Sequence, residues 1–438
     1  MGSLGYVFSS INTTNLTKKI GFWPSVALVT GNMIGAGIFL LPATMASYHG
    51  IGIIGWIIAS GGALMLALVF GHLSKLYPNT SGGPYAYTKI GLGDFAGFLV
   101  AWGYWISIWC TNAAIAVALV GYLGAFFPSL TDSPTLSSFT GLFFIWFFTW
   151  INSKDIKTIG AVQVATTILK VIPIAFLILV GVFYVDFSKV FIFPFTSDSI
   201  LPDITAVTTL TFFAFLGMES ATVPSNSIKS PETTISKATL VGTLLTTVLY
   251  LFSFIVIIGI IPPETLALST APFADTAFEI WGTPGKYLVA FGAVASTMGA
   301  LNGWILLQGQ IPAAAAKDKL FPKLFKNTNT NGSPILGIVF SSVLATLLML
   351  SNYSKTLVEA FTYMMKLSTL TVLLPYLFSI ATFALALKKT NRTSIILACL
   401  AFLFSLWIVV GCGAEIVFLG FLLLLLGIPA YVYLKKQQ

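Results

Sequence analysis

Glycine residues, and in one case a carboxylate, interrupt two long apolar runs of the sequence. They are Gly31, Gly35 and Gly37 in TGNMIGAGIFLLPA (30–43), and Gly217 and Glu219 in TFFAFLGMESATVP (211–224). Glycine tolerates a backbone that leaves the helix, and a helix that restarts after such a break offers free N–H groups that can hold a carboxylate. For the first run, close helix packing through small residues is an equal alternative.

Three ionisable side chains, Lys170, Glu219 and Lys366, also lie inside apolar runs. At the centre of a membrane span a charged side chain costs about 2.5–3.5 kcal/mol on insertion scales, so such residues usually have a functional role. Lys170 lies about 12 residues, or about 18 Å, into its run. A lysine in such a low dielectric can exchange a proton near neutral pH. The alternative is that its side chain extends (snorkels) to the membrane interface. Lys366 should face away from Ser368, two residues on, and Glu219 is a candidate partner for it.

Other kinds of chemistry have little support in the sequence. The chain has two histidines, His49 and His72, which excludes a histidine-rich metal site. Its three cysteines are far apart in apolar runs, without CxxC spacing, and are interpreted as packing residues. We find no clustered catalytic set that would indicate an enzyme and no repeated filter loops that would indicate a channel. No cofactor is therefore expected.

The composition predicts an integral membrane protein. The chain has 438 residues, of which 57% are hydrophobic and 8% charged, and its mean hydropathy is +0.93. Soluble domains carry about 25% charged residues, and a spanning helix needs about 20 apolar ones. The fold class is therefore all-α, with twelve transmembrane helices expected over residues 22–45, 51–75, 93–127, 137–152, 158–185, 203–224, 235–262, 285–312, 334–351, 357–387, 394–411 and 413–434.

The basic residues predict the orientation of these spans. If the N-terminus is inside, all but five of the 22 lysines and arginines fall in inner segments. The exceptions are Lys189, Lys286 and Lys355 in outer loops, and Lys170 and Lys366 inside spans. The positive-inside rule then places both termini in the cytoplasm, in a multi-pass protein of the cell (inner or plasma) membrane. It also accounts for the net charge of +8 without nucleic-acid binding.

The two interrupted spans divide the chain into units. Each is the first of a set of five, and matching interruptions in two halves point to an inverted-repeat binding site. We expect a cytoplasmic segment over 1–21, a ten-helix 5+5 inverted-repeat core over 22–392, and two further helices with a short cytoplasmic C-terminus over 393–438. The segment AAAAKDKLF (313–321) is predicted to form a separate amphipathic helix at the inner interface.

Several motifs resemble those of the amino acid–polyamine–organocation (APC) transporters. The motifs are GNMIGAGIFLLPA, SGGPYAY (81–87), GYWISIWCTN (103–112), FLGMESATV (215–223), NGWILLQGQ (302–310), DKLFPKLF (318–325) and LLPYLF (373–378). Within this superfamily the chain is most similar to the bacterial arginine–agmatine, lysine–cadaverine and ornithine–putrescine antiporters. The resemblance covers nearly the whole chain and implies a LeuT-like fold with broken first and sixth helices.

The resemblance also implies a substrate site. Backbone amides at Gly35, Ala36 and Gly37 would receive a carboxylate, although related antiporters often have serine where this chain has Ala36. Carbonyls near Phe213 and Leu216 would bind an amino group, with the Phe213 ring as an outer gate. The remaining binding positions are Asn32 on the first helix, Trp304 as the ring that stacks on the substrate, and Ser107, Ile108, Asn112 and Ser368 at its far end.

Some of these residues could have a purely structural role instead of binding substrate. Trp304 could belong to an interfacial aromatic belt, Asn112 could be a hydrogen-bonding contact between helices, and Phe213 could be a packing residue. A ring at Trp304 would offer a face to a cationic side chain, worth about 0.5–2 kcal/mol. Ile108 and Lys366 weigh against a strict arginine site, because an apolar side chain and a cation are poor neighbours for a guanidinium.

Four further residues are expected to act in gating or proton linkage. The resemblance places Tyr104, Glu219 and Tyr376 in an inner-gate and pH-sensing group. It places Lys170 on the fifth helix, where other members of the superfamily use a lysine ammonium in place of a sodium ion. Transport is therefore expected to be independent of sodium.

The predicted function is secondary active transport by a sodium-independent amino acid exchanger, not an enzyme. Its substrates are either cationic amino acids with their amines or a broader neutral set. A proton-coupled amino acid symporter is the alternative, and an ion channel is the alternative from a different class. The expected partners are amino acid or amine substrates, the lipid bilayer and protons, with a homodimer as a compatible assembly.

Overall fold

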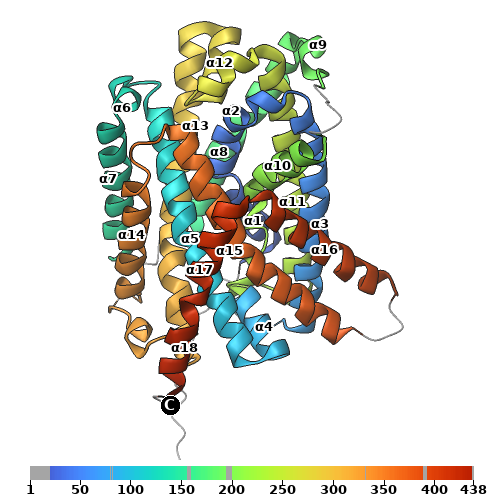
Figure 1. The fold of residues 1–438 in the computed structure, drawn as a ribbon, viewed down its shortest axis with the longest axis vertical. Coiled ribbons are helices and arrows are strands. Elements are labelled where there is room, and N and C mark those ends of the chain that lie inside the picture. The colour runs from blue at the N-terminus through green and yellow to red at the C-terminus, as the bar shows by residue number, and fades with distance from the viewer. Residues whose placement is uncertain are drawn as a thin grey trace, which may run out of the picture.

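The described residues form a single bundle of helices. The computed structural model describes residues 20–78, 80, 82–154, 159–193, 200–330, 332–387 and 392–436. Within these ranges the regular structure is helical, apart from an isolated bridge between Ile20 and Ile228 (Figure 1). Of the segment predicted over 1–21, only Ile20 and Gly21 belong to the described residues.

The helices follow the predicted order, which confirms an all-α membrane fold of about twelve helices. Among the described residues, ten segments are long and apolar enough to cross a membrane, and two shorter apolar helices stand at the fifth and ninth positions. The spanning segments are α1 (Phe22–Met33) with α2 (Ala36–Thr44), α3 (Ile51–Leu76), α5 (Asp94–Leu123), α7 (Pro134–Asn152), α8 (Ile159–Gly181), α10 (Ile200–Phe212), α11 (Pro231–Ile260), α13 (Pro272–Lys317), α14 (Ile335–Leu350), α15 (Leu357–Ala386), α16 (Arg392–Gly411), and α17 (Ala414–Leu425) with α18 (Gly427–Lys436).

Short helices connect the spans at the two ends of the bundle. They are α4 (Pro84–Leu92), α6 (Ser129–Asp132), α9 (Phe187–Val190) and α12 (Pro263–Leu268). In Figure 1, α9 and α12 lie at the top of the bundle, whereas α4 and the end of α18 lie at the bottom. The face that carries α9 and α12 is therefore opposite the face that carries α4 and the C-terminal helix.

One predicted element is wrong. The segment 313–321 does not form a separate interfacial helix, because α13 continues as far as Lys317. Alanine is the strongest helix former, and Ala313, Ala315 and Ala316 are buried, so packing favours continuing the helix. The 3₁₀ turn Lys323–Lys326 follows instead.

The first span is broken within its apolar run. The helix α1 ends at Met33, and α2 begins at Ala36. The two residues between them leave the helical region, with Ile34 at φ −74°, ψ 80° and Gly35 at φ −124°, ψ −138°. Irregular backbone at this depth is tolerated only where it is buried in protein or lines a cavity.

The sixth span is broken as well. The helix α10 gives way to the 3₁₀ turn Phe213–Phe215, and Leu216 is extended. Gly217 then takes φ +98°, a conformation that other residues rarely adopt, and Glu219 precedes a second 3₁₀ turn. The two breaks lie against each other, since a Cβ at Gly217 would come within 3.1 Å of the Asn32 side chain.

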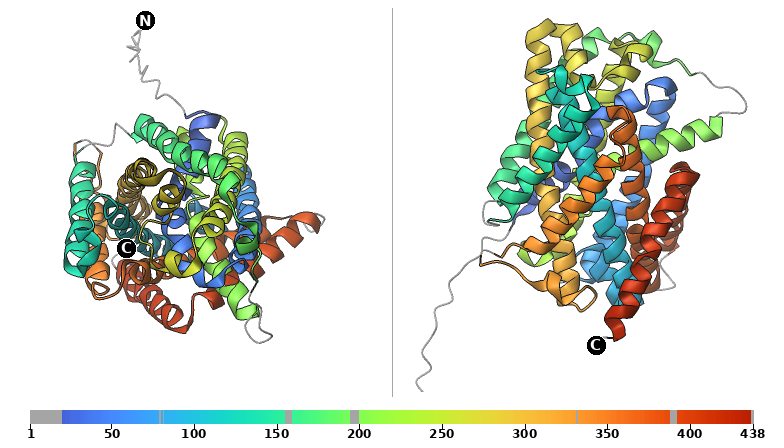
Figure 2. Two further views of the ribbon diagram at one scale, coloured as in Figure 1. Left: turned by 90° about the horizontal axis from the view of Figure 1, so that it is seen from above. Right: turned by 60° about the vertical axis from the view of Figure 1, so that its left-hand side comes forward.

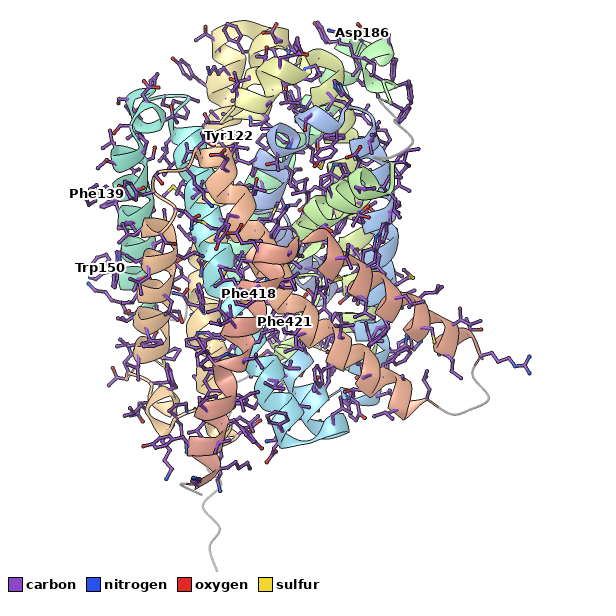
Figure 3. All side chains as sticks on the ribbon, viewed as in Figure 1. Tyr122, Phe139, Trp150, Asp186, Phe418 and Phe421 are labelled. Carbon is purple, nitrogen blue, oxygen red and sulfur yellow. The ribbon has the colours of Figure 1, made fainter. Side chains whose placement is uncertain are left out.

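Apolar side chains face outward on the periphery of the bundle. Phe139 and Trp150 on α7 are 65% and 55% exposed, and Phe418 and Phe421 on α17 also project from the bundle (Figure 3). By contrast, most residues of α5 are buried. Viewed from above and from the side, α7 and α17 lie at the rim (Figure 2), so α5 is the central helix and the rim is the surface suited to lipid.

The substitution Gly217→Ala is expected to lower the stability of the detergent-solubilised protein by about 1–3 kcal/mol. Alanine disfavours φ +98°, and its Cβ would lie 3.1 Å from Asn32 and 3.3 Å from Trp304. Gly61→Ala in α3 is the matched control, because a Cβ there meets nothing within 4 Å. Thermal unfolding measures both variants, and equal unfolding temperatures would show that the Gly217 conformation is not required.

Candidate functional site

A small cavity lies between the two helix breaks. Its volume is about 20 Å³, which is room for about one water molecule. The lining residues come from α1, α2, α5, the sixth-span break and α13: Asn32, Met33, Gly35, Gly37, Thr111, Ile115, Phe213, Ala214, Leu216 and Trp304. An amino acid is larger than this cavity, so its binding requires the lining side chains to move apart.

The start of α2 gives this cavity an anion-binding wall. Because α2 begins at Ala36, the N–H groups of its first turn have no partner within the helix and form the positive end of the helix dipole. Gly37 brings this turn close to the other break, since a Cβ there would lie 3.0 Å from the Ala214 Cα and 3.3 Å from the Phe213 ring. The side chain of Ala36 lies outside the described part of the chain.

Two aromatic rings form the other walls. Trp304 is 3% exposed and lines the cavity from α13, away from any interfacial surface. The Phe213 ring also lines it and packs edge-on against Phe361 of α15 with the ring centroids 6.0 Å apart. Phe213 therefore separates the cavity from the part of α15 around Phe361.

Two hydroxyl groups and a backbone carbonyl link α5 to α15 beside the cavity. The Ser368 hydroxyl donates to the Ser107 carbonyl at 3.0 Å, and the hydroxyls of Ser368 and Thr111 are 2.7 Å apart. Because the Ser368 proton is already used, Thr111 donates to Ser368. Sequence reasoning missed Thr111, although it is one helical turn from Ser107 and so shares its face. Ile108 is buried but does not line the cavity.

Asn112 is part of a buried network that joins four helices. Its amide donates to Gln308 Oε1 at 2.7 Å, and the Gln308 amide donates to the Ile338 carbonyl and to Ser342 Oγ. Ser342 Oγ in turn lies 2.6 Å from Thr149 Oγ1 of α7. Asn112 therefore makes a contact between helices, as one of the two interpretations predicted. Its Oδ1 is nevertheless buried, with no hydrogen-bond partner among the described residues.

The predicted inner-gate residues meet at one carboxylate. Tyr104 of α5 donates to Glu219 Oε1, and Tyr376 of α15 donates to Glu219 Oε2, each at 2.7 Å. Glu219 is completely buried, so these two hydroxyls replace the water that would solvate its oxygens. The group ties the sixth-span break to the two helices that contact each other most extensively. In the described ranges no set of three or more His, Cys, Asp or Glu side chains is placed to hold a metal ion.

Two further buried side chains contact backbone carbonyls at the breaks. The Lys170 ammonium donates to the Gly31 carbonyl at 3.0 Å, from α8 to the last turn of α1. The Tyr250 hydroxyl of α11 lies 2.6 Å from the Met33 carbonyl and 3.1 Å from the Ala214 carbonyl. It therefore bridges both breaks. The sequence did not single out Tyr250, because a tyrosine in an apolar helix carries no local signal of its distant partner.

The hypothesis that Glu219 pairs with Lys366 is wrong. Both Glu219 oxygens accept from tyrosines, and no ion pair joins the two residues in the described structure. Lys366 instead lines a different and larger cavity near the start of α17. Its orientation differs from that of Ser368, as the helical geometry predicted.

Comparisons with known proteins agree with the sequence motifs. A family model described as amino acid permease matches residues 20–433. The chain is 32% identical to a putative arginine/ornithine antiporter of Bacillus subtilis (strain 168), over 96% of this chain and 98% of that protein. It is 33% identical to the cadaverine/lysine antiporter of Escherichia coli (strain K12), over 83% and 82% of the two chains. It is 29% identical to the putrescine transporter PotE of Haemophilus influenzae, over 96% and 98%. These matches confirm the resemblance that the motifs indicated.

The substitution Glu219→Gln is expected to flatten the pH dependence of transport, because glutamine fixes a neutral side chain between Tyr104 and Tyr376 at every pH. Glu264→Gln on the exposed helix α12 is the control and should leave the profile unchanged. Initial uptake rates across mildly acidic to mildly alkaline pH measure both variants. A pH profile for Glu219→Gln that matches the wild type would show that Glu219 is only a structural hydrogen-bond acceptor.

Proposed function

Because the chain belongs to the amino acid permease family, we propose that it exchanges basic amino acids, and amines derived from them, across the cell membrane. The observation that carries this proposal is the cavity between the two broken helices. Free amides at the start of α2 suit a carboxylate, and the buried face of Trp304 suits a cationic side chain. Among the described residues that line the cavity there is no lysine or arginine.

The relatives support exchange of basic substrates. Two of them are named as antiporters, for arginine/ornithine and for cadaverine/lysine, and a third as a putrescine transporter. These names describe transporters and not enzymes. In this chain the buried Asn112 Oδ1, next in sequence to Thr111 of the cavity wall, is an acceptor that a substrate ammonium or guanidinium could use. The apolar Ile108 leaves room for neutral substrates as a second class.

Transport requires that the site open to each side of the membrane in turn, and the described contacts suggest how this is achieved. The small cavity has to widen around the substrate, with Phe213 as the gate toward α15. On the proposed inner side, a buried hydrogen-bonded group is formed by Tyr104, Glu219 and Tyr376. Moving Glu219 away from either tyrosine leaves buried polar groups unpaired, at about 1–3 kcal/mol each. This group would therefore hold the inner side shut until a proton or a substrate offsets that cost.

No sodium ion is needed in this proposal. In a broken first helix the freed carbonyls need a cation or hydrogen-bond donors, and the Lys170 ammonium supplies donors to the Gly31 carbonyl. Lys170 would thus occupy the place of a coupling cation. A lysine that gives up its proton during the cycle would link transport to protons, which is the basis of the alternative, proton-coupled symport.

The orientation of the chain in the membrane and its division into a transport core and flanking segments are also proposals. The distribution of basic residues favours both termini in the cytoplasm, so the face with α9 and α12 would be outside. The ten helices of residues 22–392 would form the transport core, with 1–21 and 393–438 outside it. Both broken spans and every cavity-lining residue belong to that core.

Proteoliposomes that contain the purified protein should take up labelled arginine in a saturable manner. Uptake should be stimulated strongly when unlabelled arginine, ornithine or agmatine is present inside, because an exchanger returns only in the loaded state. Liposomes without protein and liposomes loaded with glutamate are the controls. Equal uptake into empty and loaded vesicles, driven by an imposed proton gradient, would instead establish a symporter.

A further inference from the structure

A second cavity, of about 540 Å³, opens at the other end of α2 from the candidate site. Its walls are the end of α2 at Thr44, the start of α15, and the junction of α16 with α17 around Cys412 and Glu415. Ala43 of this pocket is six residues beyond Gly37 of the candidate site, so the two cavities are separated by about 9 Å along α2. Ala267 of α12 also lines this outer pocket, which places it on the face that carries α12.

Aromatic rings divide the outer pocket from the candidate site. Phe213 lines the candidate site and contacts Phe361 of α15, and the next residue, Thr362, lines the outer pocket. The hydroxyls of Thr362 and Thr44 are 3.4 Å apart, which joins α15 to α2 at the floor of the pocket. A substrate that passes the Phe213 ring would therefore enter or leave through this pocket.

Two of the four charged side chains in the pocket are already engaged. The Lys355 ammonium lies over the Tyr363 ring, 4.2 Å from its centroid. The Glu359 carboxylate accepts from the backbone N–H and the hydroxyl of Thr356, in a capping box at the start of α15. The capping box fixes the start of the helix and engages the Glu359 carboxylate, and the Tyr363 ring holds the Lys355 ammonium over its face.

The other two charged side chains have no such contact. Lys366 on α15 is half-buried, and Glu415 is exposed in the first turn of α17. Within the part of the chain that the structure describes, neither the Lys366 ammonium nor the Glu415 carboxylate makes an ion pair or a side-chain hydrogen bond. Lys366 lines the pocket without a protein partner among the described residues, so its ammonium is available to an anionic group of a ligand.

Resting on the proposed function, we propose that this pocket binds the zwitterionic head group of an amino acid on its way to the candidate site. Lys366 receives the α-carboxylate, and Glu415 receives the α-ammonium. The pocket volume lies within the range of about 300–1,000 Å³ that is common for small-molecule sites. An amine that lacks the carboxylate can pair with Glu415 but has nothing to offer Lys366. The pocket therefore lowers the half-saturating concentration for amino acids, relative to amines, on the α12 face.

Uptake measured separately from the two sides of the protein, in vesicles of opposite orientation, tests this proposal. From the α12 side, Lys366→Met should raise the half-saturating concentration of arginine about fivefold, the change expected for loss of one ion pair. The value for agmatine should stay the same or fall, and arginine values from the opposite side should not change. Lys366→Arg should retain wild-type behaviour, and Lys189→Met on α9 is the control. Equal losses for arginine and agmatine, or no loss, would overturn the proposal.

A binding measurement separates this site from the proposed transport function. In Trp304→Ala, which removes the candidate site's ring but leaves the outer pocket intact, labelled arginine should still bind to the purified protein. That residual binding should be lost in Trp304→Ala combined with Lys366→Met, and weakened by Glu415→Gln. Residual binding that survives Lys366→Met would refute the outer site even if wild-type exchange is normal. Residual binding that is lost as expected would support the site even if the wild type failed to exchange.

Discussion

The hydrogen bond from the Lys170 ammonium to the Gly31 carbonyl is the contact on which the rest of the structure depends. It completes the end of α1 at a point where the chain leaves the helix inside an apolar bundle. Each unpaired buried carbonyl would cost about 1–3 kcal/mol, and bulk water is absent at this depth. A break at this position is stable only if the chain or a bound ion supplies donors, and here the chain supplies them.

The same constraint explains how the second break is held. The Tyr250 hydroxyl lies within hydrogen-bond distance of a carbonyl from each break, and Gly37 lets the two breaks touch. Glu219, just beyond Gly217, is anchored by tyrosines from α5 and α15. The broken segments are thus fixed by side chains from the unbroken helices α5, α8, α11 and α15. Relative movement of these helices would change the contacts that shape the cavity between the breaks.

The sequence indicated the fold and the breaks well because their signals are local. Apolar runs of spanning length predicted the helices, and Gly35 and Gly217 predicted where two of them leave the helical path. The carboxylate of Glu219 was conspicuous for the same reason. The end of α13 was mistaken because alanines next to lysines suggest an interfacial helix, whereas burial of Ala315 and Ala316 extends the span.

Long-range partners could not be predicted in this way. Tyr250, Gln308 and Thr111 are unremarkable in their own helices, and only the packing of α11, α13 and α5 shows what they contact. Lys366 illustrates the reverse case. Its place inside an apolar run was evident from the sequence, but the partner suggested for it was wrong. A lone charge in an apolar run does not reveal which side of its helix faces which cavity.

The most direct test of the central claim is the ion dependence of transport. If the Lys170 ammonium takes the place of a coupling cation at the first break, wild-type arginine exchange in proteoliposomes should proceed at equal rates in sodium, potassium and choline buffers. Lys170→Ala should abolish exchange in all three, because the Gly31 carbonyl loses its donor. Clear stimulation of wild-type exchange by sodium would contradict the account, since the broken helix would then depend on an ion that the chain does not supply.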